Sequence, residues 1–126
     1  MLRIIFNPTE GMIVKNMPDS WEAIPQEIGC DFFDVVSFYF DDDKEGTIYD
    51  FYIDDIGNYK NLVTSVIPTD YPALVGTVVI GKSNSEGEDL NLTFSDMAKI
   101  FNHMQAYNPD KEDETKIFFF IKGVSR

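Results

Sequence analysis

Several residue types on which whole classes of protein depend are scarce in this sequence. Its 126 residues include one cysteine, Cys30, and one histidine, His103. One thiol cannot form an internal disulfide, which excludes a disulfide-stapled secreted domain and favours the reducing cytoplasm. A zinc site needs three or four protein ligands, usually cysteine and histidine, and a nucleophile triad needs a histidine base. We therefore expect no metal site, no cofactor and no enzymatic activity.

Long apolar runs are also missing. No stretch approaches the roughly 18 apolar residues of a membrane-spanning helix. The apolar segment within residues 1–8 is too short for a signal peptide. The sequence therefore predicts a cytoplasmic protein that does not associate with membranes.

Basic residues are few relative to acidic ones. The chain has 10 lysines and arginines against 22 aspartates and glutamates, which gives a net charge of -12. Direct binding of nucleic-acid phosphates is therefore not expected. Residues 31–60 hold nine acids and two bases, a net of -7. Three interpretations fit this segment: a solvated face that keeps the protein soluble, a surface for a basic partner protein, or binding of divalent cations.

The pattern of apolar residues predicts an α+β fold in one domain, residues 1–126, with an antiparallel or mixed sheet. Strands are expected where β-branched and aromatic residues cluster: 2–6, 11–17, 32–40, 47–53, 62–67, 75–80 and 117–121. The strands at 2–6 and 11–17 are expected to form one hairpin, and the clearest hairpin joins the strands at 32–40 and 47–53. The continuous apolar run at 117–121 predicts burial on both faces, either as a central strand or as a contact in a homodimer.

Two helices are expected to accompany the sheet, a short one over about 20–28 and a main amphipathic one over about 93–106. At the start of the main helix, Thr93 and Asp96 have the spacing of a capping box. The positions predicted to face the core recur at helical spacing and are Met97, Ile100, Phe101 and Met104. The positions predicted to face solvent are Asp96, Lys99 and His103.

Two binding motifs are matched in letters but not in physical context. Residues 76–83 follow the phosphate-loop pattern G-x-x-x-x-G-K-S, but β-branched residues fill its middle and an acidic segment follows it. A buried strand that ends in a loop is the better interpretation. Residues 41–48 resemble the start of an EF-hand calcium loop, yet loop position 12 is Tyr52 instead of glutamate. We interpret this second segment as a hairpin turn.

Five segments together carry a resemblance to a known family. They are a helix end at 27–29, a strand at 33–36, an acidic pair at 54–55, a G-T-strand-G segment at 74–81, and an acidic loop with the start of a helix at 87–93. In this order they resemble a small domain of unknown function found in bacteria, their phages and plasmids, over roughly residues 20–105. The resemblance implies a mobile-element setting and an accessory or counter-defence role, and it brings no established activity with it.

These observations favour a non-enzymatic binding protein whose acidic hairpin contacts a basic surface on a host protein. The alternative is a sponge-like domain that binds a small ligand or a nucleotide derivative, for which a pocket between sheet and helix would be evidence. No pair of carboxylates stands out as catalytic. The candidate partner-binding residues are Asp34, Asp41, Asp42, Asp43, Glu45, Asp50, Asp54 and Asp55.

Overall fold

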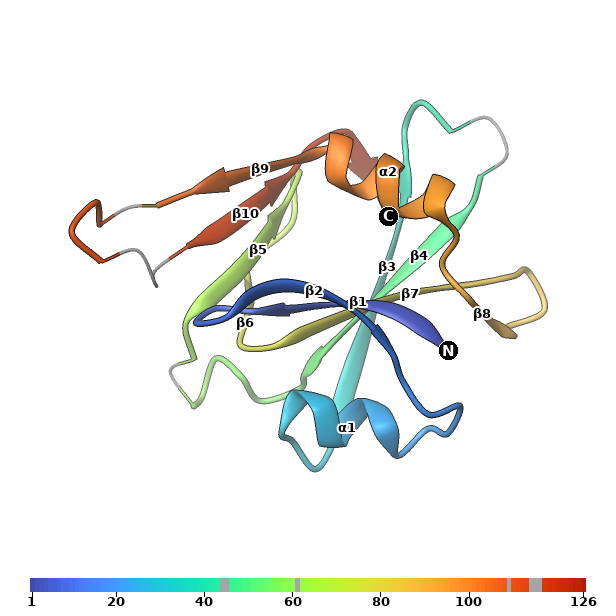
Figure 1. Ribbon diagram of the computed structural model, residues 1–126, viewed down its shortest axis with the longest axis horizontal. Helices are drawn as coiled ribbons and strands as arrows, with labels where there is room; N and C mark the ends of the chain where they lie inside the picture. Colours follow the sequence, from blue (N-terminus) through green and yellow to red (C-terminus); the bar gives the residue numbers. More distant parts are fainter. Residues whose placement is uncertain (44–45, 61, 109, 114–116) are drawn as a thin grey trace.

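The chain has an α+β fold in which two β-sheets are accompanied by two helices (Figure 1). The computed structural model describes residues 1–43, 46–60, 62–108, 110–113 and 117–126. Among the described residues, the strand pairs of the larger sheet are antiparallel. The smaller sheet is mixed, because it contains one parallel pair.

The larger sheet has the strand order β11-β3-β4-β7-β1-β2, with β8 paired to the end of β7. Its strands are β1 (Leu2–Asn7), β2 (Gly11–Asn16), β3 (Phe33–Phe40), β4 (Ile48–Asp54), β7 (Val78–Ser83), β8 (Asp89–Leu90) and β11 (Val124–Ser125). Both predicted hairpins, β1 with β2 and β3 with β4, are antiparallel pairs within this sheet. The apolar strand β7 pairs with β1 on one side and β4 on the other. Its backbone groups are thus used within the sheet, as expected for a buried strand and not for a phosphate loop.

The smaller sheet has the order β6-β5-β10-β9. Its strands are β5 (Thr64–Pro68), β6 (Leu74–Val75), β9 (Met104–Tyr107) and β10 (Phe118–Ile121). The predicted strand at 117–121 is therefore an inner strand, parallel to β5 and antiparallel to β9. The prediction that both faces of this strand are buried is wrong, because Phe118 and Phe120 are only half-buried. The side chains of Phe119 and Ile121 face the core instead.

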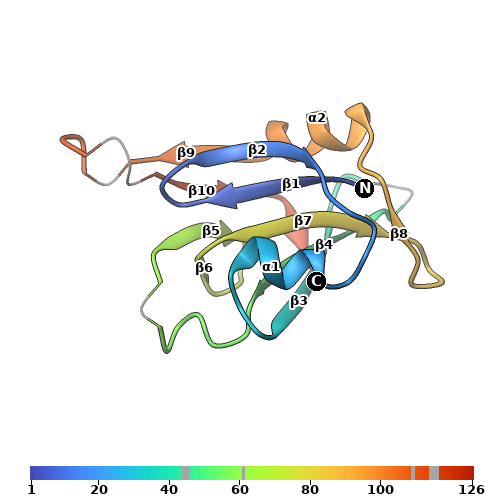
Figure 2. The same ribbon diagram turned by 60° about the horizontal axis from the view of Figure 1, so that its bottom comes forward.

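The two faces of the larger sheet are covered by different elements. On one face, the smaller sheet and helix α2 (Phe94–Asn102) close the main core, where the Phe6 and Phe119 rings lie 4.9 Å apart. On the other face, helix α1 (Ala23–Ile28) places Ala23 and Ile24 in a second apolar cluster with Ile5 and Tyr52. Figure 2 shows α1 lying against β3, β4 and β7.

Helix α2 is shorter than the expected helix over 93–106, and its polar face does not point to solvent. The chain leaves the helix at His103, whose carbonyl accepts a hydrogen bond from Lys122 N–H at 2.9 Å. From Met104 onward the backbone pairs with β10, so strand pairing replaces further helical turns. Asp96 is buried, whereas Phe101 is exposed, because the helix turns Asp96 toward the β3–β4 hairpin.

The strand predicted at 75–80 is broken in two by a glycine. Gly76 has a positive φ of 74° between β6 and β7, a backbone conformation that glycine adopts without strain. A Cβ at this position would lie 2.8 Å from a methyl carbon of Leu62. The backbone turn therefore favours glycine here, a Cβ would also displace the Leu62 side chain, and β6 and β7 join different sheets.

Candidate functional site

The eight acids predicted to form one binding surface are distributed along the whole β3–β4 hairpin. Asp34 and Asp55 lie near its open end, while Asp41, Asp42 and Asp43 follow β3 at its turn. Asp41 follows Asp34 by seven residue-to-residue steps of extended chain, a distance of about 23 Å. That is well beyond the Debye length of about 8 Å at physiological ionic strength, so the two ends act as separate electrostatic sites. Glu45 lies outside the described residues.

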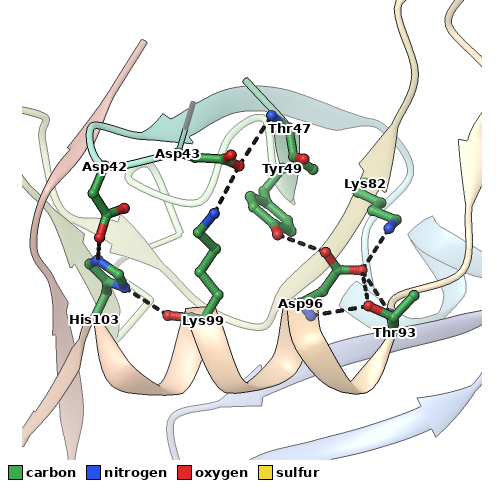
Figure 3. Close-up of polar contacts among 9 residues, drawn as sticks. All are labelled: Asp42, Asp43, Thr47, Tyr49, Lys82, Thr93, Asp96, Lys99 and His103. Carbon is green, nitrogen blue, oxygen red and sulfur yellow. Dashed lines mark hydrogen bonds and ion pairs between the residues drawn. The ribbon is translucent and has the colours of Figure 1, made fainter. Parts of the chain in front are cut away.

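The three aspartates at the turn are engaged by groups of the chain itself (Figure 3). Asp43 pairs with Lys99 Nζ at 2.9 Å and accepts a hydrogen bond from Thr47 N–H at 3.2 Å. Asp42 lies 3.3 Å from His103 Nε2. Asp41 accepts a hydrogen bond from the hydroxyl of Ser125 on β11.

His103 links the turn to the end of α2. Its Nδ1 lies 2.8 Å from the Lys99 carbonyl oxygen, and its ring lies 4.3 Å from the Phe40 ring. Lys99 and His103, both predicted to face solvent, thus hold the hairpin turn against the helix. The aspartates and the helix form one structural unit, a relationship that residue spacing along the sequence does not reveal.

A second group of polar contacts surrounds Asp96 at the start of α2 (Figure 3). Asp96 Oδ2 accepts hydrogen bonds from Thr93 N–H at 2.7 Å and Thr93 Oγ1 at 2.9 Å, and it lies 2.6 Å from Lys82 Nζ. Asp96 N–H donates in return to Thr93 Oγ1, which completes the capping box. Tyr49 donates its hydroxyl proton to Asp96 Oδ1 at 2.8 Å. One carboxylate therefore joins the helix to β4 and to β7.

The protonation states in this group follow from burial and hydrogen bonding. Burial alone would raise the pKa of Asp96, but the hydrogen bonds from Lys82, Thr93 and Tyr49 outweigh it and hold that pKa below its ordinary value. Burial, followed by the hydrogen bond to Asp96, raises the pKa of Tyr49 well above its ordinary value. Near neutral pH, Asp96 is therefore charged and Tyr49 stays protonated as its donor.

A polar hollow of about 250 Å³ opens among these side chains, between the hairpin and α2. Its lining includes two cations, Lys82 and Lys99, and two anions, Asp43 and Asp96. Each cation already pairs with one of the anions. An incoming anion would therefore have to compete with a carboxylate for either lysine.

Two further predicted residues, Asp50 and Asp54, are buried. Asp50 accepts a hydrogen bond from Ser37 Oγ at 2.8 Å, across the hairpin. The Asp54 carboxylate lies 2.5 Å from Lys60 Nζ and accepts a hydrogen bond from Ile56 N–H at 3.1 Å. The hydrogen bond to Asp54 raises the pKa of Lys60. These carboxylates stabilise the hairpin and the loop after β4, and they offer little charge to a partner.

The open end of the hairpin carries carboxylates in a different setting. A hollow of about 260 Å³, here called the acidic recess, is lined in part by Asp34, Asp54, Asp55 and Tyr71. Asp34 and Asp55 are exposed, and no ion pair joins either of them to another residue in the described part of the chain. The recess therefore presents two carboxylates that water or a partner can reach.

Two exposed aromatic residues lie close in sequence to residues that line the acidic recess. Phe32 is 73% exposed and Tyr59 is 87% exposed. The backbone holds their loops together, since Asp55 N–H donates to the Phe32 carbonyl at 3.4 Å. We did not predict these two residues as functional, because exposure of an aromatic side chain cannot be read from local spacing. Phe32 begins the strand expected at 32–40, next to Asp31, and Tyr59 lies beyond the strand expected at 47–53, so position at the end of a strand was the only available signal.

Comparison with protein-family models, with curated proteins and with solved structures finds no significant match to this chain. None of the helices among the described residues is long and apolar enough to cross a membrane. Within the same residues, no three histidine, cysteine, aspartate or glutamate side chains gather in a way that could hold a metal ion.

Proposed function

We propose that the protein is a non-enzymatic binding protein whose acidic recess takes up a lysine or arginine side chain of a basic partner protein. The observation that carries this proposal is the recess itself, where Asp34 and Asp55 stand exposed beside a hollow of about 260 Å³. A guanidinium or ammonium group entering it would gain charge-assisted hydrogen bonds.

The aromatic rings beside the recess supply the apolar part of the contact. Phe32 precedes the recess residue Asp34 by two positions, Tyr59 follows the recess residue Asn58, and both aromatic side chains are exposed. Aromatic anchors next to a charged pocket are typical of the residues that dominate binding energy in protein interfaces. A basic segment that also carries apolar side chains therefore fits this surface better than a purely basic one.

The turn of the hairpin is the weaker candidate. Asp43 pairs with Lys99, and Asp42, although its side chain is 66% exposed, lies 3.3 Å from His103 Nε2, so a ligand at the turn would compete with these groups. The net charge of -12 acts over longer range and steers basic partners toward the whole molecule. In this proposal, affinity resides at the recess and the remaining charge accelerates encounter.

The biological setting of the proposal comes from the family resemblance. A binding protein of a phage or mobile element could act as an accessory or counter-defence factor by occupying a basic surface of a host protein in the cytoplasm. The acidic recess supports this role because carboxylates can take the place of phosphates in a basic groove that normally binds nucleic acid.

The experiment that tests the proposal compares two variants with equal loss of charge. The probe is a fluorescent short peptide of alternating arginine and leucine, titrated with the protein. Replacing Asp34 and Asp55 by asparagine should weaken binding about tenfold, whereas the matched pair Asp41→Asn and Asp42→Asn should change it less than about threefold. Equal effects of the two pairs would show that bulk charge alone attracts the peptide, and the proposal would fail.

The polar hollow beside α2 favours a second candidate function, the binding of a small ligand or nucleotide derivative. It lies between sheet and helix and gathers Lys82, Lys99 and Tyr49. A thermal-shift screen with nucleoside mono-, di- and triphosphates tests it. Stabilisation that Lys99→Met removes would support this candidate, and no stabilisation by any of these probes would reject it.

A further inference from the structure

One of the two edges of the smaller sheet is formed by β9, and the other is formed by the two-residue strand β6. Strand β9, Met104–Tyr107, follows α2 directly and pairs on one side with β10. It is the last strand of its sheet, and in Figure 1 β9 lies on the outer side of β10 where the two strands extend away from the larger sheet. No strand among the described residues pairs with its other side, which is therefore open to a further strand.

The direction of each backbone group in β9 follows from one hydrogen bond. Lys122 N–H donates to the His103 carbonyl, and antiparallel pairs alternate between bonded and non-bonded along a ladder. The register pairs Met104 with Ile121 and Ala106 with Phe119. These two β9 residues are thus at non-bonded positions, with their N–H and C=O groups turned to the free edge.

The side chains of β9 leave this edge unprotected. Met104–Tyr107 reads Met-Gln-Ala-Tyr and contains neither a charge nor a proline, the usual features that block strand addition. By contrast, β2, an edge strand of the larger sheet, carries a charged residue, Lys15, which pairs with Glu27 at 2.9 Å. In a chain with a net charge of -12, an uncharged edge is the place where a second acidic chain meets least repulsion.

An aromatic cluster lies on the face of the same sheet. The Tyr107 ring lies 5.2 Å from the Phe118 ring and 6.2 Å from the Phe120 ring, with both phenylalanines half-buried. Alternation along β9 and β10 puts these three rings on the face away from the main core. A second copy beside β9 would extend this row of rings across the edge and cover more of it.

We propose that two copies of the chain pair through antiparallel β9 strands and form one continuous eight-stranded sheet, two sets of the four strands described. An antiparallel arrangement of two copies is self-complementary. The outward N–H and C=O groups of Met104 and Ala106 in one β9 strand face the same groups in the β9 strand of the other copy. Charge favours the same orientation. Lys122 lies by the start of β9, 2.9 Å from Gln105 Oε1, while residues 110–113 beyond its end hold three acids and one base.

The first test is the mass of the protein in solution, measured by light scattering after size exclusion over a roughly hundredfold range of concentration. We expect a species of twice the chain's 14.4 kDa that dissociates on dilution. Ala106→Pro removes one outward N–H and leaves the bonds to β10 in place, so it should yield monomers. Ala106→Ser keeps that N–H and should remain dimeric. A wild-type monomer at every concentration would overturn the proposal.

A second test covers the case in which the proline variant does not fold. Ala106→Glu adds a charge at the edge, and the matched control Gln26→Glu adds the same charge on the exposed side of α1. The first should dissociate the dimer and the second should not. In wild type, the amide protons of Met104 and Ala106 should exchange more slowly as concentration rises, with those of Gln105 and Tyr107 unchanged. A dimer that survives Ala106→Glu, or concentration-dependent protection confined to other strands, would contradict pairing through β9.

Discussion

Tyr49 of β4 donates its hydroxyl proton to Asp96 of α2 at 2.8 Å, across 47 positions of sequence. Both side chains are buried, so this bond fixes the helix against the β3–β4 hairpin without competition from water. The ion pair of Lys99 with Asp43 reinforces the same contact one turn further along α2. The helix and the hairpin turn therefore stabilise each other.

The contribution of this bond can be measured with a phenylalanine substitution. Tyr49→Phe removes the hydroxyl but keeps the ring, and it should lower the free energy of unfolding by about 1 kcal/mol, the usual net value of a buried hydrogen bond. Tyr59→Phe is the matched control at an exposed ring and should change it by less than about 0.5 kcal/mol. Urea unfolding of both variants checks the prediction, and equal stabilities would contradict it.

Asp96 makes the stability of the protein depend on acidic pH. Its pKa is held below the ordinary 3.8 despite burial, by Lys82, Thr93 and Tyr49. A depressed pKa in the folded state means that the carboxylate stabilises the fold above pH 3.8, and this contribution is lost as pH falls below that value. Asp96→Asn should therefore cost about 2 kcal/mol near pH 7, with a smaller difference from wild type below pH 3.8.

The control for this pH dependence is Asp31→Asn, which removes an exposed carboxylate. Its effect on unfolding should stay within about 0.5 kcal/mol of wild type at neutral pH. Urea unfolding of the three proteins from neutral to acidic pH gives the comparison. A cost of Asp96→Asn that does not change with pH would show that the carboxylate's charge is not what stabilises the helix.

The turn at Gly76 offers a prediction about backbone strain. Gly76→Ala adds a Cβ at φ 74°, 2.8 Å from a carbon of Leu62, so it combines an unfavourable backbone with a clash. Gly87→Ala adds a Cβ at φ 81° with no atom within 4 Å. The second substitution should cost about 1 kcal/mol and the first about 2 kcal/mol or more. Thermal unfolding of the two variants separates the cost of the backbone conformation from the cost of the clash. Equal costs for the two variants would mean that Leu62 simply moves aside.

The role of the aromatic rings beside the acidic recess is tested by removing one of them. Phe32→Ala should weaken binding of the arginine-leucine peptide about tenfold, because an exposed ring that anchors a partner contributes on that scale. Trp21→Ala removes another ring, 70% exposed and more than five positions in sequence from any residue that lines the recess, and should leave affinity unchanged. If both substitutions act alike, the aromatic contact is nonspecific.

The sequence was sufficient to predict the two hairpins and the presence of both helices, because period-two and helical patterns are local. It was not sufficient for the division into two sheets, which depends on Gly76 and on β10 pairing with β5 across 53 positions of sequence. The end of α2 was also missed. The apolar side chain of Met104 fits a helix as well as a strand, and only its partner Ile121 decides between them.

The candidate acids show the same limit more clearly. The sequence gives the positions of the acids but does not predict which lysines pair with them. Lys99 meets Asp43, and Lys60 meets Asp54, only in the folded chain. Net charge by segment therefore overstated the charge that the hairpin turn offers to a partner. Exposed carboxylates lie at both ends of the hairpin, Asp41 and Asp42 at the turn and Asp34 and Asp55 at the recess, but those at the recess have no ion-pair partner among the described residues.

The central claim is that a basic partner binds at the acidic recess and not at the hairpin turn. Its most direct test is an amide chemical-shift map of the ¹⁵N-labelled protein during titration with the arginine-leucine peptide. The account predicts that the largest shifts fall in residues 31–35 and 54–60, with little change at 41–43. Largest shifts at the turn, or shifts spread evenly over all exposed acids, would contradict it.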